Sequence, residues 1–133
     1  MSIVTSMAAE TLSPERTPQR LCTLSADART AVLLDAAGAL AASTEDDPAR
    51  AEELAALARG IFEAVDSGHS GEPAEQVEAQ VPGGAVFASR TPRWALAVVA
   101  RRQALPSLML YDLRSVLGEL EGGPQIVTRE AAA

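Results

Sequence analysis

A helical repeat of apolar residues between Pro48 and Val65 is the feature that most constrains the fold of this chain. Apolar side chains recur there every three or four residues, which places them on one face of an α-helix. They are Ala51, Leu54, Ala55, Ala58, Ile61, Phe62 and Val65. A helix with one apolar face needs a second layer to bury it, so the rest of the chain must supply that layer.

Three consecutive acidic residues, Glu45, Asp46 and Asp47, stand immediately before Pro48. Carboxylates at this position accept hydrogen bonds from the free N–H groups of a helix start and complement its positive end. Oxygen ligands also suit calcium or magnesium. Capping is the simpler interpretation, and we expect neither a metal ion nor any other cofactor.

A β-hairpin is predicted ahead of this helix. Residues 29–35 are apolar and partly β-branched, and the segment Asp35 to Gly38 offers a side-chain acceptor followed by a residue that tolerates positive φ. The returning strand is expected at residues 39–43, where it ends at the acidic cluster.

Three further strands are predicted after the helix, at residues 75–81, 85–90 and 94–101. Short connectors rich in proline and glycine indicate antiparallel neighbours. The first segment alternates polar and apolar residues, which is typical of an edge strand. The last is apolar on both faces and is expected at the centre of the sheet.

Two more helices are expected near the ends of the chain. Thr17 followed by Pro18 is typical of a helix start, so a short helix is predicted there. A second helix is predicted over residues 106–121, because apolar residues recur at helical spacing until Gly122. These residues are Leu108, Met109, Leu113, Val116, Leu117 and Leu120.

The 133 residues fit a single domain at residues 17–122. Residues 1–16 are expected to form a disordered head and residues 123–133 a flexible tail. The predicted order is short α, β, β, α, β, β, β, α. Because the strands are too apolar to leave either side of the sheet bare, the predicted fold class is α/β (α+β), a five-stranded antiparallel sheet with helices on both faces.

Charge excludes several function classes. The net charge is -7, and nucleic acids and anionic membranes need clustered cations, so neither partner is expected. All 11 cationic residues are arginine, which removes the P-loop lysine and the Schiff-base lysine and is typical of a GC-rich bacterial genome. A single cysteine and a start without a basic, then apolar, leader predict a cytoplasmic protein.

No catalytic set is recognisable, and we expect a protein that is not an enzyme. The segment Gly68-His69-Ser70-Gly71 resembles a nucleophile elbow, but Glu72 replaces its last glycine and the predicted context is helix, loop, strand. His69 is the only histidine, so no second imidazole is available as a base or ligand. We interpret it as a loop residue without a role.

For a few other residues, packing or solvated charge is the simpler interpretation. Cys22 lacks a companion at catalytic spacing and is interpreted as a small buried hydrophobe. Arg101 and Arg102 end the predicted central strand; solvated charge is the simpler interpretation, and a transition-state arginine the alternative. Trp94 and Tyr111 are expected in the core, with a rim position as the alternative for Tyr111.

The order of elements and the residues that carry them resemble the roadblock, or dynein-light-chain, family, over about residues 18–122. The carriers are the hairpin AVLLDAAGALAAS, the helix EELAALARGIFEAV, the strand pair EQVEAQVPGGAVFAS, and LAVVA followed by LYDLRSVLGEL. The resemblance implies the long helix on one face of the sheet and the first and last helices on the other. The first helix departs from the pattern because two prolines shorten it.

The resemblance also implies function. Family members form homodimers or heterodimers by pairing the third strand with its copy and packing the long helices side by side, and bacterial relatives stimulate hydrolysis by a small Ras-like GTPase or act as scaffolds. We therefore expect a homodimeric regulator or scaffold of such a GTPase. The alternative is a small-molecule sensor or another interaction module of similar layout, although polar groups that would converge on a pocket are sparse. A third class, a hydrolase, is not expected because the sequence shows no catalytic set.

The residues themselves also indicate a dimer. Small residues in the long helix form a second face that another helix can approach closely, although alanine is also simply the best helix former. The edge strand exposes backbone groups that a second copy can pair, provided that the register keeps Glu78 away from its own copy. The predicted interface is Ala56, Leu57, Gly60, Ala64, Gln76, Val77, Glu78, Ala79 and Gln80.

Overall fold

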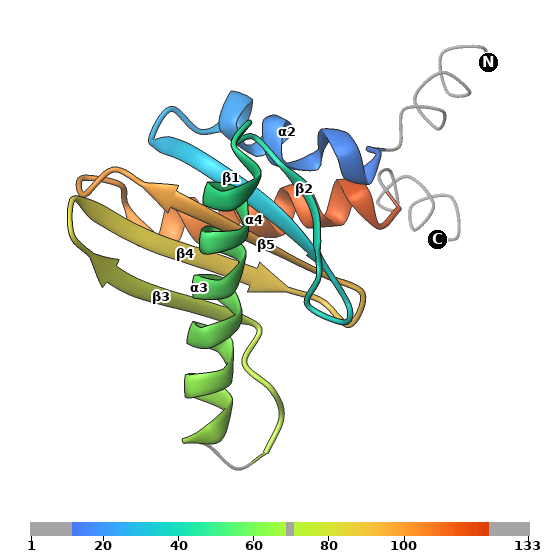
Figure 1. The fold of residues 1–133 in the computed structure, drawn as a ribbon, viewed down its shortest axis with the longest axis vertical. Helices are drawn as coiled ribbons and strands as arrows, with labels where there is room; N and C mark the ends of the chain where they lie inside the picture. Colours follow the sequence, from blue (N-terminus) through green and yellow to red (C-terminus); the bar gives the residue numbers. More distant parts are fainter. Residues whose placement is uncertain (1–11, 69–70, 123–133) are drawn as a thin grey trace, which may run out of the picture.

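The computed structural model describes residues 12–68 and 71–122, which form one sheet and its covering helices (Figure 1). In chain order the elements are the 3-10 turn η1 (Pro14–Arg16), α2 (Thr17–Leu24), β1 (Ala28–Asp35), β2 (Leu40–Ser43), α3 (Pro48–Ser67), β3 (Gln76–Val81), β4 (Gly84–Arg90), β5 (Trp94–Ala100) and α4 (Pro106–Leu120). The predicted fold class and element order are confirmed.

The sheet is antiparallel throughout, with the strand order β2-β1-β5-β4-β3. Strand β5, which is apolar on both faces, lies at its centre, and β3, whose residues alternate, lies at one edge, as predicted. The opposite edge, β2, has only four residues. The longer free edge of the sheet is therefore β3.

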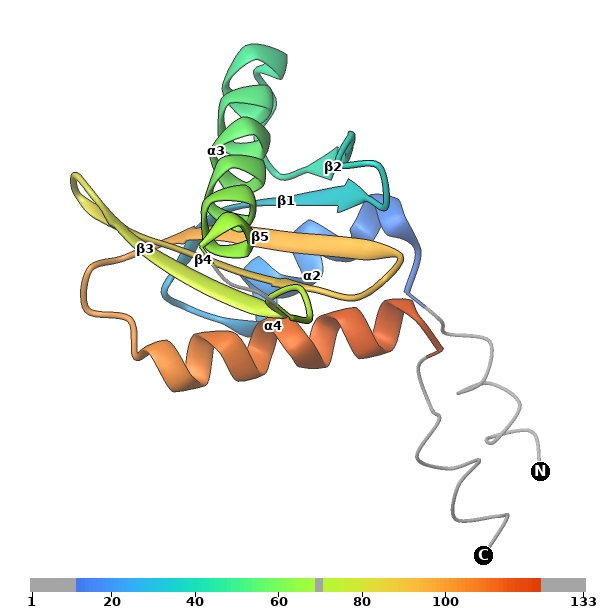
Figure 2. The same cartoon turned by 90° about the horizontal axis from the view of Figure 1, so that it is seen from below.

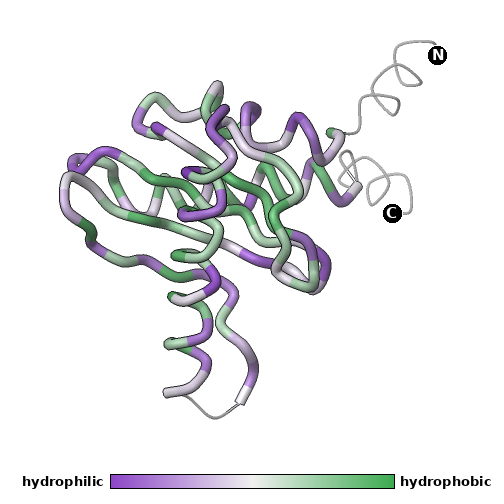
Figure 3. The backbone as a smooth tube through the Cα atoms, viewed as in Figure 1, coloured by the Kyte–Doolittle hydropathy of each residue, from purple (hydrophilic) through white to green (hydrophobic). Residues whose placement is uncertain are grey.

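Helices cover both faces of the sheet, as Figure 2 shows from below. Helices α2 and α4 pack on one face, over a core that includes Leu33, Phe87 and Leu113. Helix α3 crosses the other face, over a second core that includes Val32 and Phe62. Figure 3 shows the apolar residues concentrated in the inner strands and the polar residues at the turns.

Local hydrogen bonds explain the ends of the elements. In the β1–β2 turn the Asp35 carboxylate accepts from the backbone N–H groups of Ala37 and Ala39, each at 2.9 Å, and Gly38 has a φ of +87°. At the start of α3 the Asp47 carboxylate accepts from the Ala49 N–H at 3.0 Å. Asp47, the last residue of the acidic cluster, therefore caps the helix, as predicted for the cluster.

An ion pair joins the two helices that share a face of the sheet. The Arg20 guanidinium of α2 donates to both carboxylate oxygens of Glu119 of α4, at 3.0 and 3.1 Å. The hydrogen bond to this carboxylate, together with its charge, raises the pKa of Arg20. Both side chains are about 40% exposed, at 41% and 38%, so solvent screens the pair.

Three expectations need correction. Regular structure begins before residue 17: Pro14–Arg16 form a 3-10 turn, and Thr17 is the first residue of α2 rather than its cap, with its buried hydroxyl donating to the Ser13 carbonyl at 2.8 Å. Tyr111 is 60% exposed, so it takes the rim position given as its alternative, and Leu108, which lies off the buried stripe of α4, is 54% exposed. Residues 1–11 and 123–133 lie outside the described residues.

Candidate protein interaction surface

Helix α3 has three different faces, and the first is the buried stripe. Ala51, Leu54, Ala55, Ala58 and Phe62 point at the sheet and are less than 10% exposed. They recur at intervals of three and four residues, so they follow one side of the helix as the sequence predicts. This stripe fixes the rotation of α3 about its own axis and decides which residues face outward.

The second face is a charged flank. Glu52, Arg59, Glu63 and Asp66 follow one another at spacings of three, four and seven residues on one side of the stripe. Arg59 donates to the Gly38 carbonyl at 2.6 Å and pairs with Glu52. This flank therefore ties α3 to the β1–β2 turn of its own chain.

The third face is apolar and uncovered. Leu57, Ile61, Ala64 and Val65 lie on the opposite flank of α3, and Leu57 and Val65 are 42% and 40% exposed. Ile61 is only partly buried against the core. Large apolar side chains gathered on one side of an exposed helix are typical of a surface that binds another protein.

Strand β3 adds an open edge on the same side of the sheet. Its pairing with β4 places Val77 opposite Ala88, and both belong to the core beneath α3. By alternation Ala79 and Val81 share that face, and both are half-buried. The other edge of β3 has no strand beside it among the described residues. The apolar flank of α3 thus lies on the face of the sheet to which the edge strand β3 contributes its apolar residues.

The predicted interface residues differ in their exposure. Ala56, Leu57, Gly60 and Ala64 are exposed on α3, and no heavy atom lies within 4 Å of a Cβ built on Gly60. Val77 is 6% exposed and packs under α3, so its side chain is unavailable to a partner and only its backbone remains. The members of β3 with polar side chains, Gln76, Glu78 and Gln80, point to the face that α2 and α4 cover.

Sequence reasoning missed Ile61 and Val65 as surface residues. Both were assigned to the buried stripe because they keep its spacing. They lie at the margin of the stripe, where one apolar face continues into the next, and the sequence carries no signal that separates a core contact from an exposed flank there.

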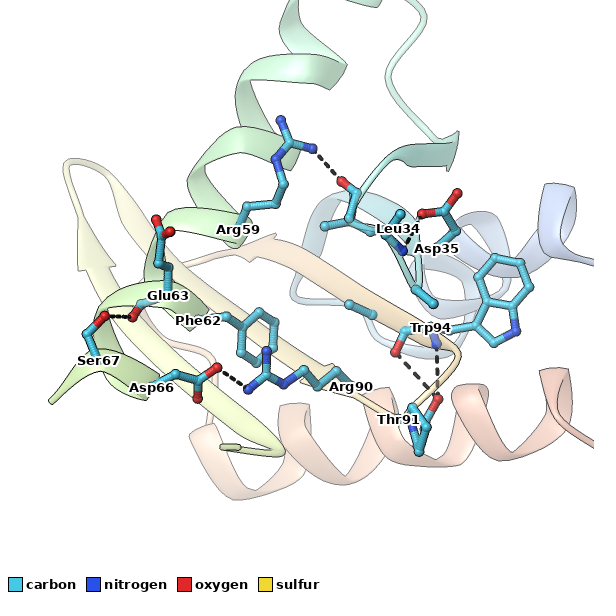
Figure 4. Close-up of a pocket in the computed structure, with 15 residues that line it drawn as sticks. Leu34, Asp35, Arg59, Phe62, Glu63, Asp66, Ser67, Arg90, Thr91 and Trp94 are labelled. Atoms are coloured by element: carbon cyan, nitrogen blue, oxygen red, sulfur yellow. Dashed lines mark hydrogen bonds and ion pairs between the residues drawn. The ribbon is translucent and has the colours of Figure 1, made fainter. Parts of the chain in front are cut away.

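A depression of about 500 Å³ lies on the charged side of α3 (Figure 4). Residues from α3, from the β1–β2 turn and from the β4–β5 turn line it. Arg90 donates to Asp66 and to the Ala74 carbonyl, each at 2.6 Å, and its guanidinium lies 4.2 Å from the centre of the Phe62 ring. Arg90 and Asp66 of this depression therefore bind each other, and Arg90 links α3 to the segment that precedes β3.

The other candidate residues form no catalytic group among those that the structure describes. Cys22 is half-buried against the core beneath α2 and α4, and burial raises the pKa of its thiol. His69 lies outside the described residues. Arg101 and Arg102 are exposed, as expected for solvated charge. Trp94 is half-buried against the core of the α2 and α4 face.

The described ranges, 12–68 and 71–122, contain neither a membrane-spanning helix nor a metal-binding group of side chains. No helix there is both long and apolar enough to span a bilayer. No group of three or more histidine, cysteine, aspartate or glutamate residues in that part of the chain has an arrangement that would hold a metal ion.

This chain is similar to known proteins in structure but matches none of the family models or curated proteins in sequence. No protein-family model and no curated protein matches the sequence. A roadblock/LC7 domain from Streptomyces avermitilis superposes with a TM-score of 0.73 at 23% identity, over 87% of this chain and 99% of that one.

Two other solved structures extend the comparison. MglB of Myxococcus xanthus gives a TM-score of 0.65 at 17% identity, over 86% of this chain and 94% of that one. Profilin IB of Acanthamoeba castellanii gives 0.56 at 15% identity, over 84% and 99%. The chain therefore has the roadblock fold that the resemblance in its sequence implies.

Proposed function

We propose that the chain forms a homodimer through α3 and β3, and that the dimer regulates or scaffolds a small Ras-like GTPase without being an enzyme itself. The observation that carries the proposal is the exposed apolar flank of α3 beside the open edge of β3. A single chain leaves both uncovered, and a two-fold axis beside β3 covers both at once.

The helix supports the first half of this interface. Leu57 and Val65 are exposed by 42% and 40%, and burying large aliphatic side chains stabilises an association by roughly 25 cal/mol for each Å² removed from water. Gly60 and Ala64 lie beside them and add almost no bulk, so the two copies of α3 can approach closely.

The strand supports the second half. Backbone groups on the outer edge of β3 form hydrogen bonds when a second copy of β3 pairs with them. Two copies of Glu78 directly opposite each other would repel, so we expect a register in which they are offset. Gln80 donates to the Glu78 carboxylate at 3.5 Å, which keeps that charge on the face of α2 and α4.

The GTPase half of the proposal rests on the fold. The chain shares its architecture with roadblock/LC7 domains and with MglB, and the resemblance implies a regulator or scaffold of a Ras-like GTPase. Fold alone does not decide function, so this half needs its own experiment. A net charge of -7 favours a partner with a basic surface.

The experiment first establishes whether a small Ras-like GTPase is encoded beside this chain, and then uses that GTPase in the GDP-bound state and bound to a non-hydrolysable GTP analogue. We expect binding in at least one state, measured by calorimetry with the full chain. Single-turnover hydrolysis with and without the chain then separates a regulator from a scaffold. Absence of binding in both states would contradict the proposed partner and leave the dimer untouched.

The arginine pair at the end of β5 gives a further check on the role of the chain. If hydrolysis is stimulated, we expect Arg101→Ala with Arg102→Ala to change the rate by less than about threefold, because solvated arginines stabilise no transition state. A fall of about a thousandfold would identify a transition-state arginine instead.

A further inference from the structure

Three arginines surround one shallow depression at the end of the sheet opposite the β1–β2 turn. Arg29 stands at the start of β1, and Arg101 and Arg102 follow β5. Gly83 and Gln103 complete the lining of this depression, whose volume is about 450 Å³. The antiparallel register that pairs Ala28 with Ala100 brings these distant segments together. We call the three side chains the arginine cluster.

The arginine cluster forms no ion pair with the described residues, although Asp27 lies beside it and its backbone carbonyl accepts from the Arg101 N–H at 3.0 Å. In the described part of the chain, the arginines that form ion pairs are Arg20, Arg50, Arg59 and Arg90. The cluster forms none, and its printed side-chain contact is a hydrogen bond of 3.5 Å from Arg29 to the Gly83 carbonyl. Like charges held together repel, so an anion from outside the described residues would stabilise this arrangement.

An apolar surface continues from the cluster along α4. Leu105, Leu108 and Tyr111 are 64%, 54% and 60% exposed, and Leu105 follows Arg102 by three residues. Leu108 and Tyr111 point away from the stripe that buries Met109 and Leu113. Most of the large apolar side chains that the described residues expose on the α2 and α4 side therefore gather at one end of α4.

We propose that the arginine cluster and the Leu105, Leu108 and Tyr111 surface form a docking site for an acidic, amphipathic segment of a partner protein. Carboxylates of the segment pair with the guanidiniums, and its apolar side chains cover the leucines and the tyrosine. A free phosphate group would use the arginines alone and leave three large apolar side chains in water. The combination favours a peptide.

The docking site is distinct from the proposed dimer surface. Helix α4 lies beneath the sheet, whereas α3 crosses the opposite face (Figure 2). The apolar part of the site therefore lies on the face of the sheet opposite α3, and the site does not depend on the proposed GTPase.

The test is selection from a random 12-residue peptide library displayed on phage, with the full chain as bait. We expect the selected peptides to carry net negative charge and at least two large apolar residues. Their affinity, measured by fluorescence anisotropy, should fall at least tenfold for the triple variant R29E/R101E/R102E and for L105S/L108S. The matched control R16E/R50E/R93E changes three exposed arginines outside α4 and should keep the affinity.

Other results would overturn the proposal. Selected peptides without net negative charge, or with equal affinity for the cluster variant and the control, would show that the site does not bind acidic segments. Tighter binding of tripolyphosphate than of any selected peptide would identify a phosphate site. We expect no binding of the chain to phosphatidylserine vesicles. If the wild-type chain binds them and R29E/R101E/R102E does not, the arginine cluster is a membrane contact instead.

Discussion

Gly84 is the residue whose side chain the fold can least accommodate. A Cβ at this position would lie 2.4 Å from the Ala100 carbonyl oxygen on the neighbouring strand. This oxygen belongs to the backbone and cannot rotate away, so the β4–β5 pairing would have to shift. We expect Gly84→Ala to lower the free energy of unfolding by about 1–3 kcal/mol, measured by urea denaturation.

Gly118 supplies the matched control for this substitution. It lies inside α4, and no heavy atom stands within 4 Å of a Cβ built on it. Gly118→Ala should raise the free energy of unfolding by about 0.5–1 kcal/mol, because alanine loses less backbone entropy in a helix. Destabilisation of similar size in both variants would contradict the close approach of β4 to β5.

The Cys22 thiol gives a second prediction at the residue scale. Burial raises its pKa, so the folded chain holds less of the reactive thiolate than the unfolded chain at the same pH. At pH 8 we expect an aromatic disulfide reagent to modify Cys22 several-fold more slowly in buffer than in denaturant, followed by absorbance. Equal rates, normalised with a free thiol in each solvent, would show that the thiol is exposed.

At the scale of elements, Arg90 joins α3 to the segment that leads into β3. It donates to Asp66 and to the Ala74 carbonyl and lies over the Phe62 ring. We expect Arg90→Ala to cost about 2 kcal/mol in the free energy of unfolding. Arg90→Lys should restore only part of the lost stability. An ammonium group lacks the planar guanidinium that makes both hydrogen bonds while it stacks on the Phe62 ring.

The comparison for Arg90 is Arg93, three residues along the chain. Arg93 is exposed and forms no ion pair with any residue in the described ranges, so Arg93→Ala should change the free energy of unfolding by less than about 0.5 kcal/mol. A loss at Arg93 as large as that at Arg90 would show that net charge, rather than the contacts of Arg90, sets the stability.

The elements themselves were largely predictable. Alternation placed β3 at an edge, apolar residues on both faces placed β5 at the centre, and the turn residues Asp35 and Gly38 marked the first hairpin, because these signals depend on neighbours in the sequence. For Tyr111 the core was expected first and the rim second, and the structure shows an exposed side chain. Hydrophobicity alone favours burial, and only the rotation of α4 on the sheet decides which of its apolar residues are exposed.

The sites were less predictable than the elements. The small residues and Leu57 of α3 indicated an interface, but the charged and apolar flanks become distinct only when the buried stripe fixes the rotation of the helix. Arg29 lies more than seventy residues from Arg101 in the sequence. Only the sheet register brings them together, and no local pattern encodes that register.

At the scale of the whole molecule, the central claim is that two copies associate through α3 and β3. Leu57 and Leu24 allow a matched pair of substitutions, because both are helical leucines that are 42% exposed, one on each side of the sheet. Leu57→Glu places a charge in the proposed interface, and Leu24→Glu places the same charge away from it.

Sedimentation equilibrium at tens of micromolar tests this claim most directly. The account predicts a mass of about twice 13.8 kDa for the wild-type chain and for Leu24→Glu, and a mass close to 13.8 kDa for Leu57→Glu. Circular dichroism should show the same helix content in all three. A monomeric wild-type chain, or a Leu57→Glu variant that remains fully dimeric, would contradict the proposed association through α3 and β3.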